Sequence, residues 1–128
     1  PSMPDWRDLC RGIPRLRLSD DGKTVEVPIA RGRFQRIEIR ETSETFELSG
    51  VIARRSVLRT IEDAALRIWR RNRTTALVGF RIDARDRLVG EAWLPKAGVT
   101  RVEFVWVLRH IASECDLLEF HLTGRDRE

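Results

Sequence analysis

Tyrosine is absent from this chain of 128 residues, and lysine, cysteine and histidine each occur only twice. Cys10 and Cys115 are too few and too far apart for a disulfide scaffold or for a zinc site of paired cysteines. A single disulfide between them is one alternative. Two buried free thiols in a reducing compartment are the favoured interpretation.

Long apolar runs are also missing. No stretch approaches the roughly 20 apolar residues that span a bilayer. The N-terminus also lacks the charged region followed by an apolar run that is typical of a signal peptide. We therefore expect a soluble, cytoplasmic protein with no membrane association. Because Pro1 and Ser2 precede Met3, residues 1–3 are expected to be a cloning remnant or disordered, and residues 125–128 are expected to be a frayed tail.

Catalytic and metal-binding motifs are lacking as well. The chain has no Gly-rich phosphate loop and no nucleophile elbow. His110 and His121 lie about three helical turns apart, so they cannot share a metal, and we expect both at the surface. The sequence predicts no enzyme, no cofactor and no metal site. With 41% hydrophobic residues, residues 1–128 are predicted to form a single domain.

Charge is concentrated in one segment. Of the 24 basic residues only Lys23 and Lys96 are lysines, which leaves 22 arginines. Residues 1–53 carry nine basic and nine acidic side chains, and residues 74–128 carry eight and nine, whereas residues 54–73 carry seven arginines against two carboxylates. This basic face consists of Arg54, Arg55, Arg59, Arg67, Arg70, Arg71 and Arg73. Its plain interpretation is a solvated helix face, and the alternative is a contact surface for nucleic acid or an acidic protein.

The first half of the chain predicts β-structure. Pro4–Cys10 suits a short helix, and the alternation of apolar and polar residues then predicts three or four antiparallel strands. Inward positions include Val25 and Val27, Ile37 and Ile39, and Phe46, Leu48 and Gly50. Pro28 cannot donate to a ladder, which favours an edge position or a bulge there.

The second half predicts a helix, a hairpin and a helix. A single helix is expected over Ser56–Asn72, with Ser56 as N-cap. Its inward face is expected to hold Leu58, Ile61, Ala65, Ile68 and Trp69. The expected placement of Trp69 in the core weakens the nucleic-acid alternative, because stacking on bases needs exposed aromatic rings.

Two short strands, Ala76–Ile82 and Leu88–Leu94, are then expected to pair around a turn at residues 83–86. Thr100 and Glu103 form a capping box at the start of a final helix. That helix is expected to end at Gly124 and to bury Phe104, Leu108, Ile111, Cys115 and Leu118.

The outer side of this last helix carries apolar residues that the core stripe does not explain. Trp106 lies roughly 160° from that stripe, and Val102 and Leu117 share its side. A partner or dimer surface at Val102, Trp106 and Leu117 is one interpretation. The other is that another element of the same chain, such as the N-terminal helix, covers this side.

Several short motifs resemble the type III secretion chaperone-like superfamily, in particular its YbjN-like branch. They are Ala64–Leu66 with Asn72, Gly79–Asp83, Leu88–Pro95, Phe104, Ala112, Asp116–Glu119 and Leu122–Gly124. The order of short helix, strands, helix, hairpin and helix matches too. The resemblance implies an α+β domain, usually homodimeric, whose relatives bind segments of partner proteins without catalysis. The predicted pI near 10 favours the YbjN-like branch, because secretion chaperones tend to be acidic.

From residues and resemblance together, we expect a non-enzymatic protein-binding module of the chaperone or adaptor kind. Extended segments would add to a sheet edge or enter apolar grooves. The alternative is a nucleic-acid-binding domain that uses the arginine-rich segment 54–73.

Overall fold

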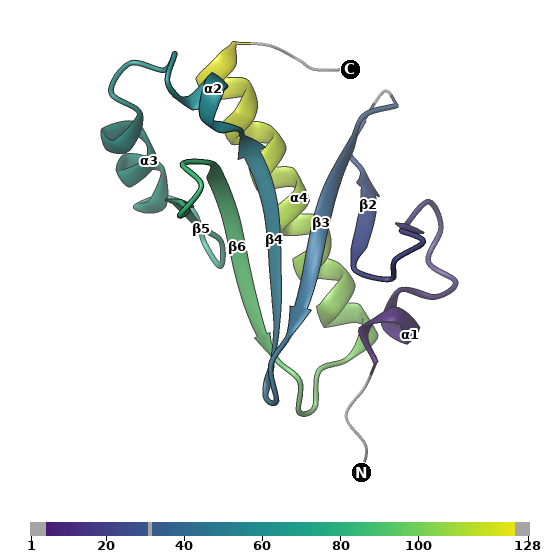
Figure 1. Ribbon diagram of the computed structural model, residues 1–128. Helices are drawn as coiled ribbons and strands as arrows, with labels where there is room; N and C mark the ends of the chain where they lie inside the picture. The colour runs from purple at the N-terminus through teal and green to yellow at the C-terminus, as the bar shows by residue number, and fades with distance from the viewer. Residues whose placement is uncertain (1–4, 31, 125–128) are drawn as a thin grey trace.

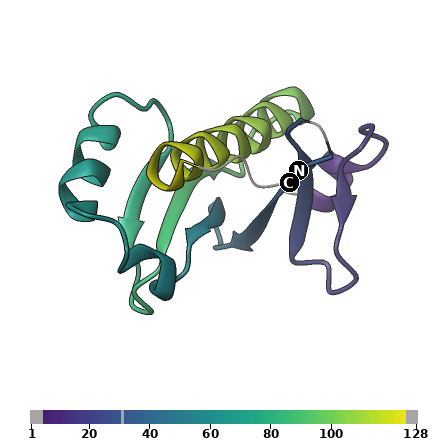
Figure 2. The same cartoon turned by 90° about the horizontal axis from the view of Figure 1, so that it is seen from above.

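The computed structural model describes residues 5–30 and 32–124, so the expectations for residues 1–3 and 125–128 lie outside this part of the chain. Six antiparallel strands form one sheet in the order β1-β2-β3-β4-β6-β5, and helix α4 crosses one of its faces (Figures 1 and 2). The elements are α1 Trp6–Cys10, β1 Arg17–Leu18, β2 Thr24–Pro28, β3 Phe34–Glu41, β4 Thr45–Ala53, α2 Arg55–Leu58, α3 Ala64–Asn72, β5 Gly79–Ile82, β6 Leu88–Pro95 and α4 Arg101–Thr123. The predicted α+β class is confirmed, and so is the predicted order of elements except for the helix before β5.

Apolar and polar residues alternate along the strands, and the apolar positions form the buried face of the sheet. In β4, Phe46, Leu48 and Gly50 point toward α4 and are buried, as predicted. β4 pairs with β3 on one side and with β6 on the other. The first four strands form the predicted meander. Strand β1 has only two residues and ends before it reaches Pro28 of β2. No β1 carbonyl therefore lies opposite Pro28, and the N–H that proline lacks costs the sheet no hydrogen bond.

Helix α4 closes the core. The Thr100 hydroxyl accepts a hydrogen bond from the Glu103 amide, and the Glu103 carboxylate accepts one from the Thr100 amide, which confirms the capping box. Gly124 ends the helix in a left-handed conformation. Phe104 meets Phe46 edge to face, with ring centroids 5.4 Å apart. The predicted inward stripe of α4 is buried throughout.

Two glycines allow α4 to approach the middle of the sheet. Gly50 on β4 and Gly90 on β6 are register partners, and Cys115 of α4 lies directly over them. A Cβ atom on Gly90 would come within 2.7 Å of the Cys115 Sγ, and one on Gly50 within 3.3 Å. Because real Cβ atoms keep a greater distance, any larger residue at Gly90 would force the helix or the thiol to move.

The predicted single helix over Ser56–Asn72 is wrong. The segment forms two helices, α2 and α3, and Asp63 between them has a left-handed backbone with φ of 54°. Arg54, not Ser56, is the N-cap of α2, and its side chain makes no capping bond. The Thr60 hydroxyl donates to the Val57 carbonyl at the end of α2, a local bond that competes with helix continuation.

The break changes which side chains face inward. Leu58 in α2 and Ile68 in α3 are buried separately, and Ile61 is half-buried. Ala65 and Trp69 were expected in the core and are instead exposed. Successive residues of an α-helix are rotated by about 100° around its axis. Because Ile68 faces the core, Trp69 points toward solvent.

We expect Gly90→Ala to lower the free energy of unfolding by about 1–3 kcal/mol, because the new methyl group collides with the Cys115 thiol. Gly79→Ala is the matched control on the neighbouring strand, since a Cβ atom added there would meet no other atom within 4 Å. Urea denaturation measures both.

The double variant Gly90→Ala with Cys115→Ala tests the cause. Removing the thiol should make the Gly90→Ala penalty smaller, so that the two effects are not additive. Strict additivity would mean that Cys115 is not what the new methyl group meets.

Candidate partner-binding surface

The outer side of α4 is exposed where the sequence predicted it. Val102 is 79% exposed, Trp106 54% and Leu117 42%. Val102 and Trp106 lie one turn apart and line the same two hollows, of about 450 and 520 Å³. Leu117 lies about 16 Å further along the helix and lines neither of them. The structure therefore brings together two of the three predicted residues.

Two further apolar side chains extend this surface. Leu77, just before β5, is 67% exposed, and Trp93 on β6 is 65% exposed. Leu77 lines one hollow with Val102 and Trp106 and a second, of about 250 Å³, with Trp93. We call these four residues, Leu77, Trp93, Val102 and Trp106, the apolar band. It passes from the open face of the sheet around the β5 side to the outer side of α4.

The N-terminal helix does not cover this surface. α1 packs against α4, and the side chain of Arg101 donates to the Asp8 carbonyl at 3.1 Å. Ile13, which follows α1, lines the hollow beside Trp106. Because Trp106 keeps more than half of its surface exposed, the interpretation that α1 buries it is wrong.

Trp106 and Leu77 are held in place by one histidine. The His110 ring stacks on Trp106, with centroids 4.9 Å apart, and its Nε2 lies 2.8 Å from the Ala76 carbonyl oxygen. That contact ties the segment before β5 to α4. Leu77 adopts a left-handed backbone with φ of 66°. This conformation is unfavourable for any residue with a Cβ atom, because that atom comes too close to the backbone.

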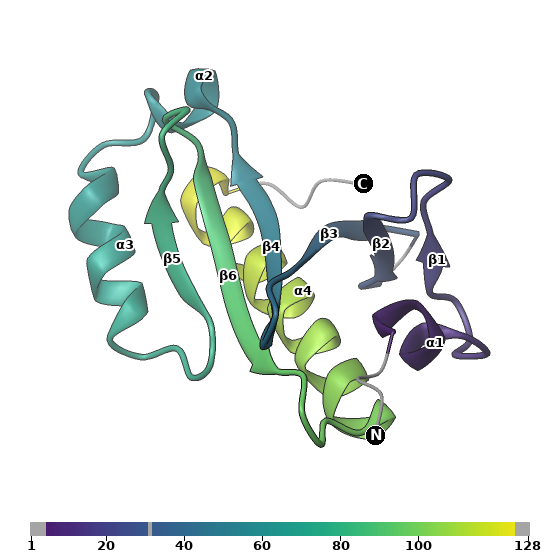
Figure 3. The ribbon, with the colours of Figure 1, turned by 60° about the horizontal axis from the view of Figure 1, so that its bottom comes forward.

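The free edge of β5 is partly occupied by a side chain. The Asn72 side chain donates to the Phe80 carbonyl at 2.8 Å and accepts from the Phe80 amide at 2.7 Å. It thereby imitates a neighbouring strand, and α3 lies beside β5 as well (Figure 3). At the opposite edge β1 has only two residues. Neither edge offers a long unpaired ladder to a partner strand.

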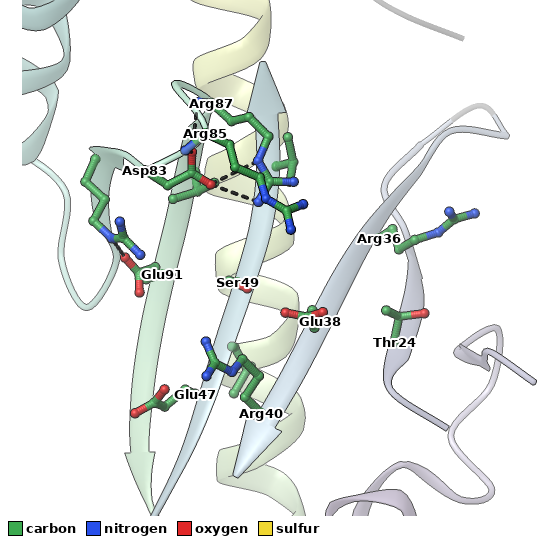
Figure 4. A pocket seen from close by; sticks show the side chains of 14 residues that line it. Thr24, Arg36, Glu38, Arg40, Glu47, Ser49, Asp83, Arg85, Arg87 and Glu91 are labelled. Carbon is green, nitrogen blue, oxygen red and sulfur yellow. Dashed lines mark hydrogen bonds and ion pairs between the residues drawn. The ribbon is translucent and has the colours of Figure 1, made fainter. Parts of the chain in front are cut away.

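The face of the sheet opposite α4 is open and charged. It forms a hollow of about 650 Å³. The polar residues lining it include Thr24, Arg36, Glu38, Arg40, Glu47, Ser49, Asp83, Arg85, Arg87 and Glu91 (Figure 4). Arg81 pairs with Glu91, and Arg87 with Asp83 at 2.8 Å. Partial burial raises the pKa of Asp83, but hydrogen bonds from Arg87 and Arg85 outweigh it and lower that pKa overall. These opposite charges largely neutralise one another.

The seven arginines of the predicted basic face lie on the two helices α2 and α3 and on the residues that flank them, and three of the seven have partners within the chain. Arg71 pairs with Glu114 at 3.0 Å in a mostly buried contact, and Arg67 donates to the His121 carbonyl. Arg55 lies 3.7 Å from Asp86. The remaining members, Arg54, Arg59, Arg70 and Arg73, are exposed. The Arg73 guanidinium lies 5.2 Å from the ring centroid of exposed Trp69.

The cysteines are free and buried, as the favoured interpretation predicted. Burial raises the pKa of the Cys10 thiol to about 11 and that of Cys115 to about 12. Both thiols are therefore protonated at neutral pH and are poor nucleophiles. Among residues 5–30 and 32–124, no cluster of histidine, cysteine and carboxylate side chains has the arrangement of a metal site. The same part of the chain contains no helix able to cross a bilayer.

No protein-family model matches the chain, and no curated protein matches it in sequence. Solved structures do match. YbjN from E. coli, described as a transcription-regulator candidate, has a TM-score of 0.71 at 18% identity, covering 96% of each chain. The Yersinia pestis secretion chaperone SycH, solved with a fragment of YscM2, has a TM-score of 0.53 at 11% identity, covering 91% of this chain and 95% of the other.

SpcU of Pseudomonas aeruginosa, solved with ExoU, has a TM-score of 0.56 at 15% identity, covering 86% of this chain and 92% of the other. This chain has the fold of YbjN and of the type III secretion chaperones. The resemblance seen in the sequence is thus confirmed for the fold, over nearly the whole chain.

The Asn72 contact can be tested by hydrogen exchange. Phe80 directs its N–H and C=O toward Asn72, so in an antiparallel ladder Gly79 and Arg81 direct theirs toward β6. Asn72→Ala should speed exchange of the Phe80 amide while that of Arg81 stays slow, at a cost of about 1 kcal/mol. Asn72→Asp keeps the acceptor and should protect Phe80 better than alanine does. An unchanged Phe80 amide in Asn72→Ala would contradict this account of the edge.

Proposed function

We propose that this chain is a non-enzymatic protein-binding module, chaperone- or adaptor-like, that holds a segment of a partner polypeptide. The observation that carries the proposal is the apolar band. Four large apolar side chains, each more than half exposed, line hollows that adjoin one another. Contiguous exposed apolar surface with aromatic anchors is typical of protein interaction sites.

The strained backbone of Leu77 supports the same conclusion. A leucine in a left-handed conformation costs about 1–2 kcal/mol relative to a favourable one. Strain of this kind persists where surrounding contacts enforce it, and it is concentrated at functional sites. Here His110 and Asn72 hold the chain on either side of Leu77, at Ala76 and at Phe80. The result is an apolar side chain presented to solvent beside Val102 and Trp106.

The proteins that share this fold support a polypeptide ligand. SycH was solved with a fragment of YscM2, and SpcU with ExoU. For the present chain we propose binding through side-chain hollows rather than by strand addition, because Asn72 occupies the β5 edge at Phe80. Unbridged Cys10 and Cys115 suit a reducing compartment, and we propose that the protein acts in the cytoplasm.

We also propose that the chain is a homodimer through α3. Leu66 and Trp69 are exposed on this helix, with Glu62 and Asp63 before them and Arg70 and Arg73 after. An antiparallel pair of α3 helices would set Leu66 against Trp69 of the second copy. It would also bring the acidic start of each helix to the basic end of the other, as a twofold interface requires.

Nucleic-acid binding is the second candidate, and the exposure of Trp69 favours it. An exposed ring among Arg70 and Arg73 could stack on a base while the guanidinium groups contact phosphates. The logarithm of the affinity for oligo-dT should then fall linearly with the logarithm of the salt concentration, and Arg70→Glu with Arg73→Glu should abolish binding. We rank it second because Arg55, Arg67 and Arg71 already have partners within the chain.

Leu77→Gly separates binding from stability. Glycine relieves the strained backbone, so the free energy of unfolding should stay unchanged or rise, whereas affinity for bound peptides should fall because the apolar side chain is lost. The probes are peptides selected on the wild-type protein from a random library displayed on phage, measured by fluorescence anisotropy.

Asp86→Gly is the matched control. Asp86 also has a positive φ, of 59°, but lies in the β5–β6 turn away from the apolar band. This variant should leave peptide affinity unchanged. Selected peptides that bind Leu77→Gly and Trp106→Ala as well as wild type would refute the proposed function.

The dimer is tested by light scattering in low salt and in about 0.5 M salt, where the Debye length falls to about 4–5 Å. A dimer at both concentrations is expected, because Leu66 and Trp69 supply apolar contact. Leu66→Asp should give monomers, whereas Leu117→Asp, elsewhere on the surface, should not. A dimer that survives Leu66→Asp would exclude α3 as the interface.

A further inference from the structure

The hollows along the apolar band differ in charge. In the hollow beside Trp93, Arg81 and Glu91 form an ion pair with each other. The hollow between Leu77 and Trp106 contains one charged residue, Glu103, whose carboxylate is engaged by Thr100 in the capping box. Two of the three hollows therefore present no uncompensated positive charge.

The third hollow, beside Ile13, is basic. Arg101 and Arg109 line it together with Trp106 and His110, and no carboxylate lines it. Arg101 donates to the Asp8 backbone carbonyl, which leaves its charge without a carboxylate partner among the described residues. Arg109 is exposed and has no hydrogen-bond or ion-pair partner within the part of the chain that the structure describes.

The spacing places this positive charge next to the apolar anchor. Arg109 follows Trp106 by three residues, so both lie on the same side of α4. Arg101 lies about 12 Å from Arg109 along the helix axis, one residue before Val102. A partner side chain that packs on Trp106 therefore has neighbouring residues within reach of a guanidinium group.

We propose that the segment held by this protein is apolar where it crosses Leu77 and Val102 and carries an aspartate or glutamate beside the residue that packs on Trp106. The carboxylate pairs with Arg109. The inference rests on the proposed function and specifies its ligand by charge complementarity.

The carboxylate belongs to a side chain rather than to a chain terminus. Terminal carboxylates are captured by groups of free backbone N–H donors. At the start of α4 the Thr100 hydroxyl already accepts from the Glu103 amide, and the Glu103 carboxylate, which accepts from the Thr100 amide, already places a negative charge at this helix end. What the hollow offers is the planar guanidinium group of Arg109, which suits a side-chain carboxylate.

The test uses phage-selected random peptides on the full chain, followed by synthetic peptides of the best sequence. We expect acidic residues to be enriched next to an aromatic or large aliphatic residue. Replacing the acidic residue by its amide should weaken binding about three- to fivefold. Arg109→Glu should weaken it at least as much, and a lysine in place of the peptide's acidic residue should restore binding to that variant.

Arg85→Glu is the matched control, since it makes the same charge change on the open face of the sheet. It should leave affinity for the peptide unchanged. The inference is overturned if the selected peptides need Trp106 but tolerate loss of their acidic residue, if Arg85→Glu weakens binding as much as Arg109→Glu, or if only a free C-terminal carboxylate is required. Recovery of no specific peptide would overturn both this inference and the proposed function.

Discussion

The close approach of α4 to the centre of the sheet determines the rest of the structure. Cys115 lies over Gly50 and Gly90, where no larger residue fits without movement. This contact fixes which stripe of the helix is buried. Because Phe104, Leu108 and Ile111 face the sheet, Val102 and Trp106 must face outward. The exposed surface of α4 is thus a direct consequence of the packing of its inner side.

The same packing brings distant segments together around the apolar band. His110 on α4 reaches the carbonyl of Ala76, and Asn72 at the end of α3 reaches the backbone of Phe80. Between these two anchors Leu77 has little freedom and takes a strained, exposed conformation. The β5 edge is thereby occupied at Phe80, while a row of apolar hollows is left open. This combination favours recognition of side chains over addition of a strand.

The sequence predicts those features that depend on near neighbours. The capping box at Thr100, the end at Gly124 and the alternation in β4 are all local, and all are confirmed. The prediction of one helix over Ser56–Asn72 was wrong. The apolar residues recur at helical spacing through the whole segment, and this spacing does not reveal that α2 and α3 pack separately against the rest of the chain. Trp93 could have been found, since strand alternation directs it away from Leu94. Leu77 could not, because its backbone conformation depends on contacts with residues remote in sequence.

The four tryptophans provide the most direct test of the apolar band as the polypeptide-binding surface. Trp6 is buried, Trp69 lies on α3, and Trp93 and Trp106 lie at two ends of the band. Their indole N–H signals can be followed by NMR during titration of the labelled protein with a phage-selected peptide. The account predicts shifts for Trp106 and Trp93 and none for Trp6 or Trp69. Shifts confined to Trp69, or no shift in Trp106 at saturation, would contradict it.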